Sequence, residues 1–181
     1  MKLWHPLVPF DPDAWPDWQL RGQVQRQGCQ IQLVYELNQG QGSPLHWPQP
    51  SKPPCRRDGL WQGTCFELFI GEAHAESYAE LNVSPSGDWN WYGLRGYRQG
   101  LEPQPLTKAP LQSIIASGEP DACQWRVLLQ LELPQAWEQV SLRAGMTAVM
   151  ARLDGSVGYW AQHHGGPEPD FHRTDARVLV L

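Results

Sequence analysis

The chain has 181 residues, enough for one domain with a sizeable core; apolar residues make up 41% of it and charged residues only 18%. The net charge of −5 argues against a nucleic acid partner, because phosphate binding requires clustered lysines and arginines. No apolar run approaches the roughly 20 residues that span a bilayer, so we expect no membrane partner.

Frequent turns and short alternating runs predict an all-β chain. The 17 prolines and 17 glycines leave little room for long helices. The only helix candidate is 134–140, and a loop crossing the end of a sandwich explains it equally well. The other runs alternate apolar with polar residues or are continuously apolar, which is typical of strands. In chain order they are 18–24, 29–37, 64–71, the hairpin 78–92, the weaker 112–118, then 124–133, 145–153, 158–163 and 177–181.

These elements favour one domain over residues 1–181, folded as an antiparallel β-sandwich of jelly-roll type with at most one short helix. A closed barrel is the alternative. Residues 38–60 are dominated by proline and glycine and predict a long irregular loop, a kind of segment that often carries function.

The cysteines and the N-terminal residues indicate the cellular compartment in which the protein is expected. No C-x-x-C spacing occurs, which argues against a thiolate zinc site. The N-terminal residues lack the apolar core of a secretory signal, so we expect a cytoplasmic protein. That location also disfavours a disulfide, although the sequence leaves the state of the cysteines open.

The turn at residues 84–87, Ser-Pro-Ser-Gly, sets the faces of the hairpin 78–92. It matches a type I turn closed by glycine, which predicts a three-residue loop. Counting outward then places Trp89 and Trp91 on the buried face with Val83 and Leu81. A four-residue loop would reverse this arrangement.

The opposite face of the hairpin is polar. It collects Glu80, Asn82, Asn90 and Tyr92, and Glu67 joins it if 64–71 pairs with 77–84. Carboxylates and amides can bind hydroxyl groups, so this face is a candidate ligand surface. An ordinary solvated face is the alternative, but the face is short of lysine, arginine and threonine.

Four stretches resemble the DOMON-like family, and most closely its branch related to family 9 carbohydrate-binding modules. They are LWQGTCFELFIG (60–71), YAELNVSPSGDWNWY (78–92), YRQG (97–100) and YWAQHHGGPEPDFH (159–172). The resemblance implies a β-sandwich that binds a ligand on one concave face, and relatives bind sugars or haem. It also implies an aromatic clamp of Trp61 and Trp160, with Glu67, Asn82 and Arg98 reading polar groups. The lack of an export signal and of an attached catalytic domain argues against polysaccharide targeting.

We therefore expect a non-catalytic domain, without a cofactor, that binds a carbohydrate or another small polar ligand. The expected ligand-binding residues are Trp61, Glu67, Glu80, Asn82, Asn90, Tyr92, Arg98 and Trp160. We assign no catalytic or metal-binding residue, and the sequence leaves a protein partner undetermined.

Two alternatives remain open. One is haem binding, for which the candidate axial ligands are Met146, Met150, His163, His164 and His172. The other is a metal-dependent enzyme using the histidine-rich segment 163–175, although a Gly- and Pro-rich loop with hydrogen-bonded histidines explains that segment better. Glu67 and Glu80 could in principle form a glycosidase pair, but nothing else in the sequence supports one.

Overall fold

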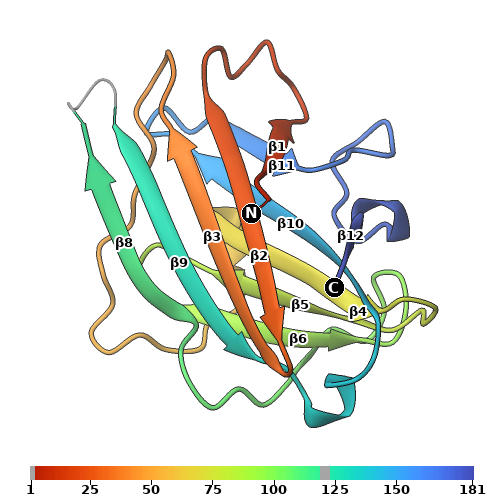
Figure 1. Ribbon diagram of the computed structural model, residues 1–181. Coiled ribbons are helices and arrows are strands. Elements are labelled where there is room, and N and C mark those ends of the chain that lie inside the picture. Colours follow the sequence, from red (N-terminus) through yellow and green to blue (C-terminus); the bar gives the residue numbers. More distant parts are fainter. Residues whose placement is uncertain (1–2, 119–122) are drawn as a thin grey trace.

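The computed structural model describes residues 3–118 and 123–181 and consists of two antiparallel sheets whose strands cross one another (Figure 1). Sheet A contains β2 (Gln19–Gln27), β3 (Gln30–Asn38), β8 (Leu111–Ser117) and β9 (Gln124–Glu132). Sheet B contains β4 (Cys65–Glu72), β5 (Tyr78–Val83), β6 (Trp89–Leu94), β7 (Glu102–Pro103), β10 (Leu142–Ala151), β11 (Val157–Ala161) and β12 (Leu179–Val180).

Strand β1 (His5–Pro9) joins the two sheets, because it pairs with β11 of sheet B and with β2 of sheet A. The strand order is β7-β6-β5-β4-β10-β11-β1-β2-β3-β9-β8, with β12 paired to β10. Within the described residues the order runs from β7 to β8 without closing, so the fold is a curled sandwich and not a closed barrel. The predicted all-β sandwich is confirmed.

Each run predicted as a strand contains one in the structure. The helix candidate 134–140 holds only a single 3-10 turn, Gln135–Trp137, and two further short turns are Leu60–Gln62 and Thr174–Ala176. Strand β1 was not predicted, because its sequence HPLVP carries two prolines, which lack the N–H that a strand ladder uses. The two-residue β7 is too short for a pattern.

The hairpin of β5 and β6 has the predicted three-residue loop. The amide of Ser84 donates to the carbonyl of Asp88 at 2.9 Å, and Gly87 takes a φ of 92° that glycine adopts without strain. Val83 therefore lies opposite Trp89, and Leu81 opposite Trp91. These side chains are buried between the sheets, where each large apolar side chain contributes about 1.5–3 kcal/mol.

Sheet B is covered on both faces, and this determines where a site can form. Its inner face packs on sheet A, while its outer face carries a second apolar cluster that includes Phe69, Tyr92, Val149 and Phe171. Phe171 comes from the segment 162–173 that follows β11 and folds back over the sheet. We call residues 162–173 the C-terminal segment. The polar face predicted to be solvated or open is thus largely buried.

Within the part of the chain that the structure describes there is neither a membrane-spanning helix nor a disulfide. Among residues 3–118 and 123–181, none of the helical turns has the length and hydropathy needed to span a bilayer. The cysteines at 29, 55, 65 and 123 are free thiols.

Candidate ligand-binding site

A pocket of about 340 Å³ opens on the outer face of sheet B. Its floor consists of strand residues, and its walls come from the turn Leu60–Gln62, the loop 95–101 and the C-terminal segment. Trp61 and Tyr159 keep 37% and 39% of their surface exposed and therefore form an aromatic rim. The full lining is Trp61, Glu67, Phe69, Glu80, Leu94, Arg98, Leu101, Val149, Tyr159, Pro169, Phe171 and His172.

The register of sheet B brings two carboxyl groups to the floor of this pocket. Glu67 of β4 lies opposite Asn82 of β5, and the next residue on the same face, Phe69, lies opposite Glu80. Because side chains alternate along a strand, both glutamates project from the outer face. They occupy diagonal positions on neighbouring strands, within range of mutual electrostatic repulsion.

One oxygen of Glu80 lacks a partner. Its Oε1 accepts a hydrogen bond from Asn82 Nδ2 at 2.7 Å. Its Oε2 is buried and has no hydrogen-bond partner among the described residues, while the side chain lines the pocket and Glu80 is only 4% exposed. Burial raises the pKa of this carboxyl, against the lowering effects of the Asn82 hydrogen bond and the Arg98 charge. A buried acceptor without a donor costs about 1–3 kcal/mol, which a ligand donor can recover.

Glu67 is held in a protonated state at neutral pH. It is 2% exposed, and its Oε2 accepts a hydrogen bond from the hydroxyl of Thr147 at 3.2 Å. Burial, and after it the charge of Glu80, raise the Glu67 pKa to about 8, although hydrogen bonds from Thr147 and Cys65 oppose the change. Two neighbouring carboxyl groups in a dry environment cannot readily both be ionised.

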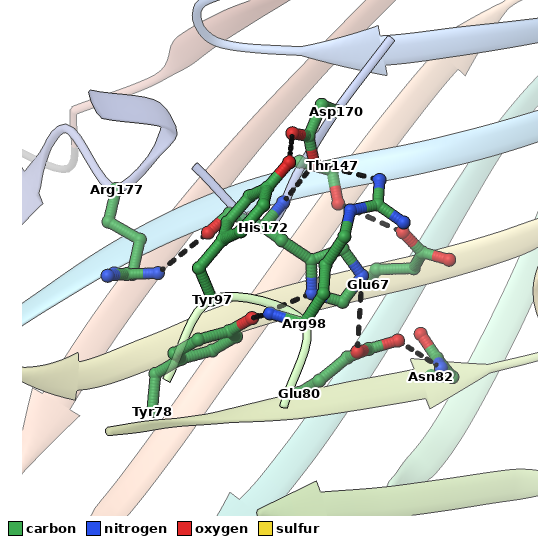
Figure 2. Close-up of polar contacts among 10 residues, drawn as sticks. All are labelled: Glu67, Tyr78, Glu80, Asn82, Tyr97, Arg98, Thr147, Asp170, His172 and Arg177. Carbon is green, nitrogen blue, oxygen red and sulfur yellow. Dashed lines mark hydrogen bonds and ion pairs between the residues drawn. The ribbon is translucent and has the colours of Figure 1, made fainter. Parts of the chain in front are cut away.

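His172 presents an N–H toward Glu80. The Tyr78 hydroxyl accepts a hydrogen bond from the backbone N–H of Arg98 at 3.3 Å and lies 2.8 Å from His172 Nδ1. We assign its proton to the bond with Nδ1, because that hydroxyl has no other acceptor among the described residues. Burial and the nearby Arg98 charge lower the His172 pKa to about 4, so the ring is neutral at pH 7. With Nδ1 accepting, the proton is on Nε2, which lies 3.9 Å from Glu80 Oε2 (Figure 2).

Asp170 fastens the two walls of the pocket to each other. One of its oxygens accepts from the Arg98 guanidinium at 2.9 Å, and the other accepts from the Tyr97 hydroxyl at 2.5 Å. The loop 95–101 is thereby tied to the C-terminal segment (Figure 2). Arg98 has a φ of 53°, an uncommon value for a side-chain-bearing residue, which the hydrogen bonds at both of its ends help to maintain.

Four of the residues expected to bind ligand line the pocket: Trp61, Glu67, Glu80 and Arg98. Asn82 does not line it, but orients Glu80 through the hydrogen bond described above. Its own Oδ1 is buried and unpartnered within the described ranges.

Asn90 and Tyr92 serve a different purpose from the one expected. Both donate to Asp58 Oδ1, at 2.8 and 2.6 Å, so they anchor the irregular loop that precedes Trp61. The ring of Tyr92 also packs edge-on against Trp61 with centroids 6.2 Å apart. Neither residue lines the pocket; both hold structure beside Trp61.

Trp160 was expected to form the aromatic clamp with Trp61, but the structure places it elsewhere. It is 1% exposed, lies in the core between the sheets and packs edge-on against Trp15 with centroids 5.8 Å apart. The reason is strand alternation: Trp160 lies opposite inward-facing Ala148, whereas Tyr159 lies opposite Val149, which lines the pocket. The second aromatic residue of the rim is therefore Tyr159.

The sequence reasoning also missed most of the wall. Phe69 could have been found, because it shares the face of Glu67 by strand parity. The C-terminal segment has no periodicity that would place it over sheet B. The pocket-lining residues missed are Phe69, Leu94, Leu101, Val149, Tyr159, Pro169, Phe171 and His172.

The residues considered for haem or metal binding are dispersed. Met146 and Met150 are fully buried between the sheets, and the ring of His164 hydrogen-bonds the carbonyl of Val8 at 2.9 Å. His172 alone among the candidates lines the pocket. Across residues 3–118 and 123–181, no three metal-ligating side chains come together.

Comparison with known proteins identifies the fold. No family model and no curated protein matches the sequence. The structure is similar to that of a candidate carbohydrate-binding protein from Bacteroides uniformis ATCC 8492, with 13% identity over 97% of this chain and 84% of that one, and a TM-score of 0.65. It is less similar to family 9 carbohydrate-binding modules from Caldicellulosiruptor kristjanssonii in complex with cellotriose and glucose. These are 10% identical over 88% of this chain and 72% and 73% of theirs, with TM-scores of 0.46 and 0.45.

Proposed function

We propose that this protein is a non-catalytic domain that binds a sugar, or a similar small ligand rich in hydroxyl groups, in the pocket on sheet B. The observation that carries the proposal is the pair formed by Glu80 Oε2 and His172 Nε2, 3.9 Å apart. Among the described residues neither atom has a hydrogen-bond partner; Oε2 is an acceptor, and Nε2 is a donor in the tautomer assigned above. A hydroxyl group is both donor and acceptor, so one ligand oxygen between them can satisfy both.

The rim of the pocket supports the same ligand class. Aromatic rings cover the apolar C–H faces of sugar rings, and Trp61 and Tyr159 offer partly exposed rings beside the polar floor. The volume of about 340 Å³ is at the small end of ligand pockets, which suits one sugar unit or the end of a longer chain. The fold likeness to the Bacteroides uniformis protein agrees with this proposal, although fold alone does not assign function.

A binding role is favoured over hydrolysis by the position of the carboxyl groups. A glycosidase needs an acid and a second carboxylate on either side of the scissile bond. Glu67 and Glu80 instead lie side by side on neighbouring strands of the pocket floor. Both would contact the same side of a bound sugar.

Calorimetric titration with simple mono- and disaccharides tests the proposal. Binding of at least one sugar at millimolar concentration or below is expected, and Trp61→Ala should weaken it by about tenfold through loss of ring contact. Trp4→Ala is the matched control, because Trp4 lies against Arg21 of sheet A, away from the pocket. If no sugar binds at millimolar concentration, or if both variants weaken binding alike, the proposal is wrong.

A further inference from the structure

The pocket contains two carboxyl groups, those of Glu67 and Glu80, which is more than the binding of a neutral sugar requires. The acidic and basic side chains that line it are Glu67, Glu80, Arg98 and His172. The Arg98 guanidinium is paired with Asp170, and the His172 ring is neutral at pH 7. Within the described residues neither carboxyl group forms an ion pair with a cation at that pH, although the Arg98 charge acts on Glu80.

The other charged or titratable groups near the pocket either contact other residues or are uncharged. Arg177 lies over the ring of Tyr78, 4.5 Å from its centroid, and donates to the carbonyl of His172. Asp58 accepts hydrogen bonds from Asn90 and Tyr92 at the foot of the irregular loop. The thiol of Cys65 is buried beside Glu67 and stays protonated, because burial raises its pKa.

Four aromatic side chains line the same pocket as these carboxyl groups, namely Trp61, Phe69, Tyr159 and Phe171. The face of an aromatic ring is electron-rich and attracts cations, and the attraction grows when the cation is removed from water. An ionised carboxylate without an ion-pair partner, in a pocket also lined by aromatic rings, is complementary to an organic cation, whereas a neutral sugar needs only the rings and a few hydrogen-bonding groups.

We propose that the ligand of this pocket carries a protonated amine and, resting on the function proposed above, that it is an amino sugar whose ammonium group binds at Glu80 beside Glu67. The ammonium donates to the unpartnered Oε2 of Glu80, while a neighbouring hydroxyl of the ligand accepts from His172 Nε2. The ammonium charge also favours ionisation of Glu67 beside it. A neutral sugar satisfies the Oε2 atom but leaves the charge of Glu80 without a counter-charge and Glu67 protonated.

The charge balance gives the proposal a measurable signature. At pH 7 Glu67 holds a proton because its pKa is about 8. A bound ammonium favours the ionised carboxylate, so Glu67 releases a proton to the buffer when the amine binds. Titration calorimetry in two pH 7 buffers with different ionisation enthalpies measures this release, because the observed heat then differs between the buffers.

The experiment compares matched pairs of ligands: glucosamine with glucose, galactosamine with galactose, and cyclohexylamine with cyclohexanol. An amino sugar is expected to bind about tenfold or more tightly than its neutral counterpart, with proton release. Equal affinities within each pair, or tighter binding of the neutral sugar, overturn the inference while the proposed sugar-binding function stands.

The remaining outcomes separate the two proposals. If no sugar binds but cyclohexylamine does, and cyclohexanol does not, the amine inference holds and the sugar-binding function is wrong. If none of the six compounds binds, both are wrong.

Variants of the floor carboxyl groups give a second test. Glu80→Gln keeps the shape of the side chain and is expected to abolish the preference for the amine, measured as the ratio of amino-sugar to neutral-sugar affinity falling to about one. Glu67→Gln is expected to abolish the proton release and serves if Glu80→Gln fails to fold. Glu72→Gln, at the exposed end of the same strand β4, is the control. An amine preference that survives both floor substitutions contradicts the proposal.

Discussion

The Nε2 atom of His172 lies 3.9 Å from Oε2 of Glu80, a gap too long for a hydrogen bond and short enough for one ligand atom to bridge. The two residues are far apart in the chain, and they meet only because the C-terminal segment folds back over sheet B. Tyr78 fixes which nitrogen of the ring carries the proton. The site therefore depends on both the strand register and the covering segment.

Removing the ring nitrogen that faces Glu80 tests this arrangement directly. His172→Phe keeps an aromatic ring against Phe69, whose centroid is 5.1 Å from that of His172. It removes the donor at Nε2 and the acceptor at Nδ1. We expect ligand affinity to fall by about tenfold, the loss of one to two hydrogen bonds of about 1 kcal/mol each.

The control for this substitution is His164→Phe, since His164 is hydrogen-bonded to the carbonyl of Val8 outside the pocket. Its ligand affinity, measured by calorimetry, should equal that of the unmodified protein. An unchanged affinity in His172→Phe would show that the ligand does not use this nitrogen.

Burial of Glu67 makes stability depend on pH. Its pKa is about 8 when folded against an ordinary value of 4.5, so between these values the folded state holds a proton that the unfolded state has lost. The free energy of unfolding should then fall as pH rises toward 8, by at most about 1.4 kcal/mol per pH unit from this group, and level off above it. His172, with a pKa of about 4, has the opposite slope below its ordinary 6.5, so the cleanest window is pH 6.5–8.

Glu67→Gln should flatten that slope and raise the free energy of unfolding at pH 8, because Gln keeps the shape without a charge to bury. Urea unfolding followed by tryptophan fluorescence at several pH values measures both effects. Glu72→Gln, on the exposed end of β4, should leave the slope unchanged. Identical slopes for the unmodified protein and Glu67→Gln would mean that Glu67 ionises normally.

The hairpin shows how far the sequence determines the site. The turn at 84–87 fixes the loop length, and the loop length fixes which side chains share a face with Glu80 and Asn82. Strand parity and turn chemistry are local rules, so this part of the site was predicted correctly. The same rules placed Trp89 and Trp91 in the core.

What covers a face is not a local property, and here the prediction failed. The polar face was expected to be a ligand surface or an ordinary solvated face, but the irregular loop before Trp61 and the C-terminal segment bury most of it. Neither has a periodicity that shows which surface it contacts. The confusion of Trp160 with Tyr159 has a related cause: in a five-residue strand, a shift of one residue exchanges the two faces.

The turn itself can be tested at Gly87. Its φ of 92° is strained for other residues, and an added Cβ would lie 3.1 Å from Cγ of Pro54. Gly87→Ala should lower the free energy of unfolding by about 1–2 kcal/mol or more, from backbone strain and from this contact. Gly155→Ala separates the two causes, because Gly155 has a φ of 86° and no atom within 4 Å of an added Cβ.

Thermal unfolding of both glycine variants, compared with the unmodified protein, gives the measurement. We expect Gly87→Ala to be the less stable of the two. Equal losses would mean that Pro54 moves aside at no cost and that only the backbone conformation matters.

Asp170 should control how tightly the walls of the pocket are held. Asp170→Asn removes the charge that pairs with Arg98 and weakens the hydrogen bond from Tyr97. We expect faster amide hydrogen exchange in residues 95–101 and faster ligand dissociation, with only a small loss of global stability since the Arg98 side chain is half exposed. Asp154→Asn is the control, because Asp154 is in a turn with Ser156. Exchange rates that stay unchanged in Asp170→Asn would contradict the proposed fastening.

Substitutions of the adjacent aromatic residues Tyr159 and Trp160 on β11 should affect ligand binding and fold stability separately. Trp160→Ala leaves a cavity between the sheets beside Trp15 and is expected to cost about 3–5 kcal/mol, as for other buried aromatic residues. Tyr159→Ala removes a partly exposed ring from the pocket rim and should lower ligand affinity by about tenfold with a small effect on stability. Urea unfolding and calorimetric titration of both variants make the comparison. If Tyr159→Ala destabilises the fold as much as Trp160→Ala and leaves affinity unchanged, the rim has been assigned to the wrong residue of the pair.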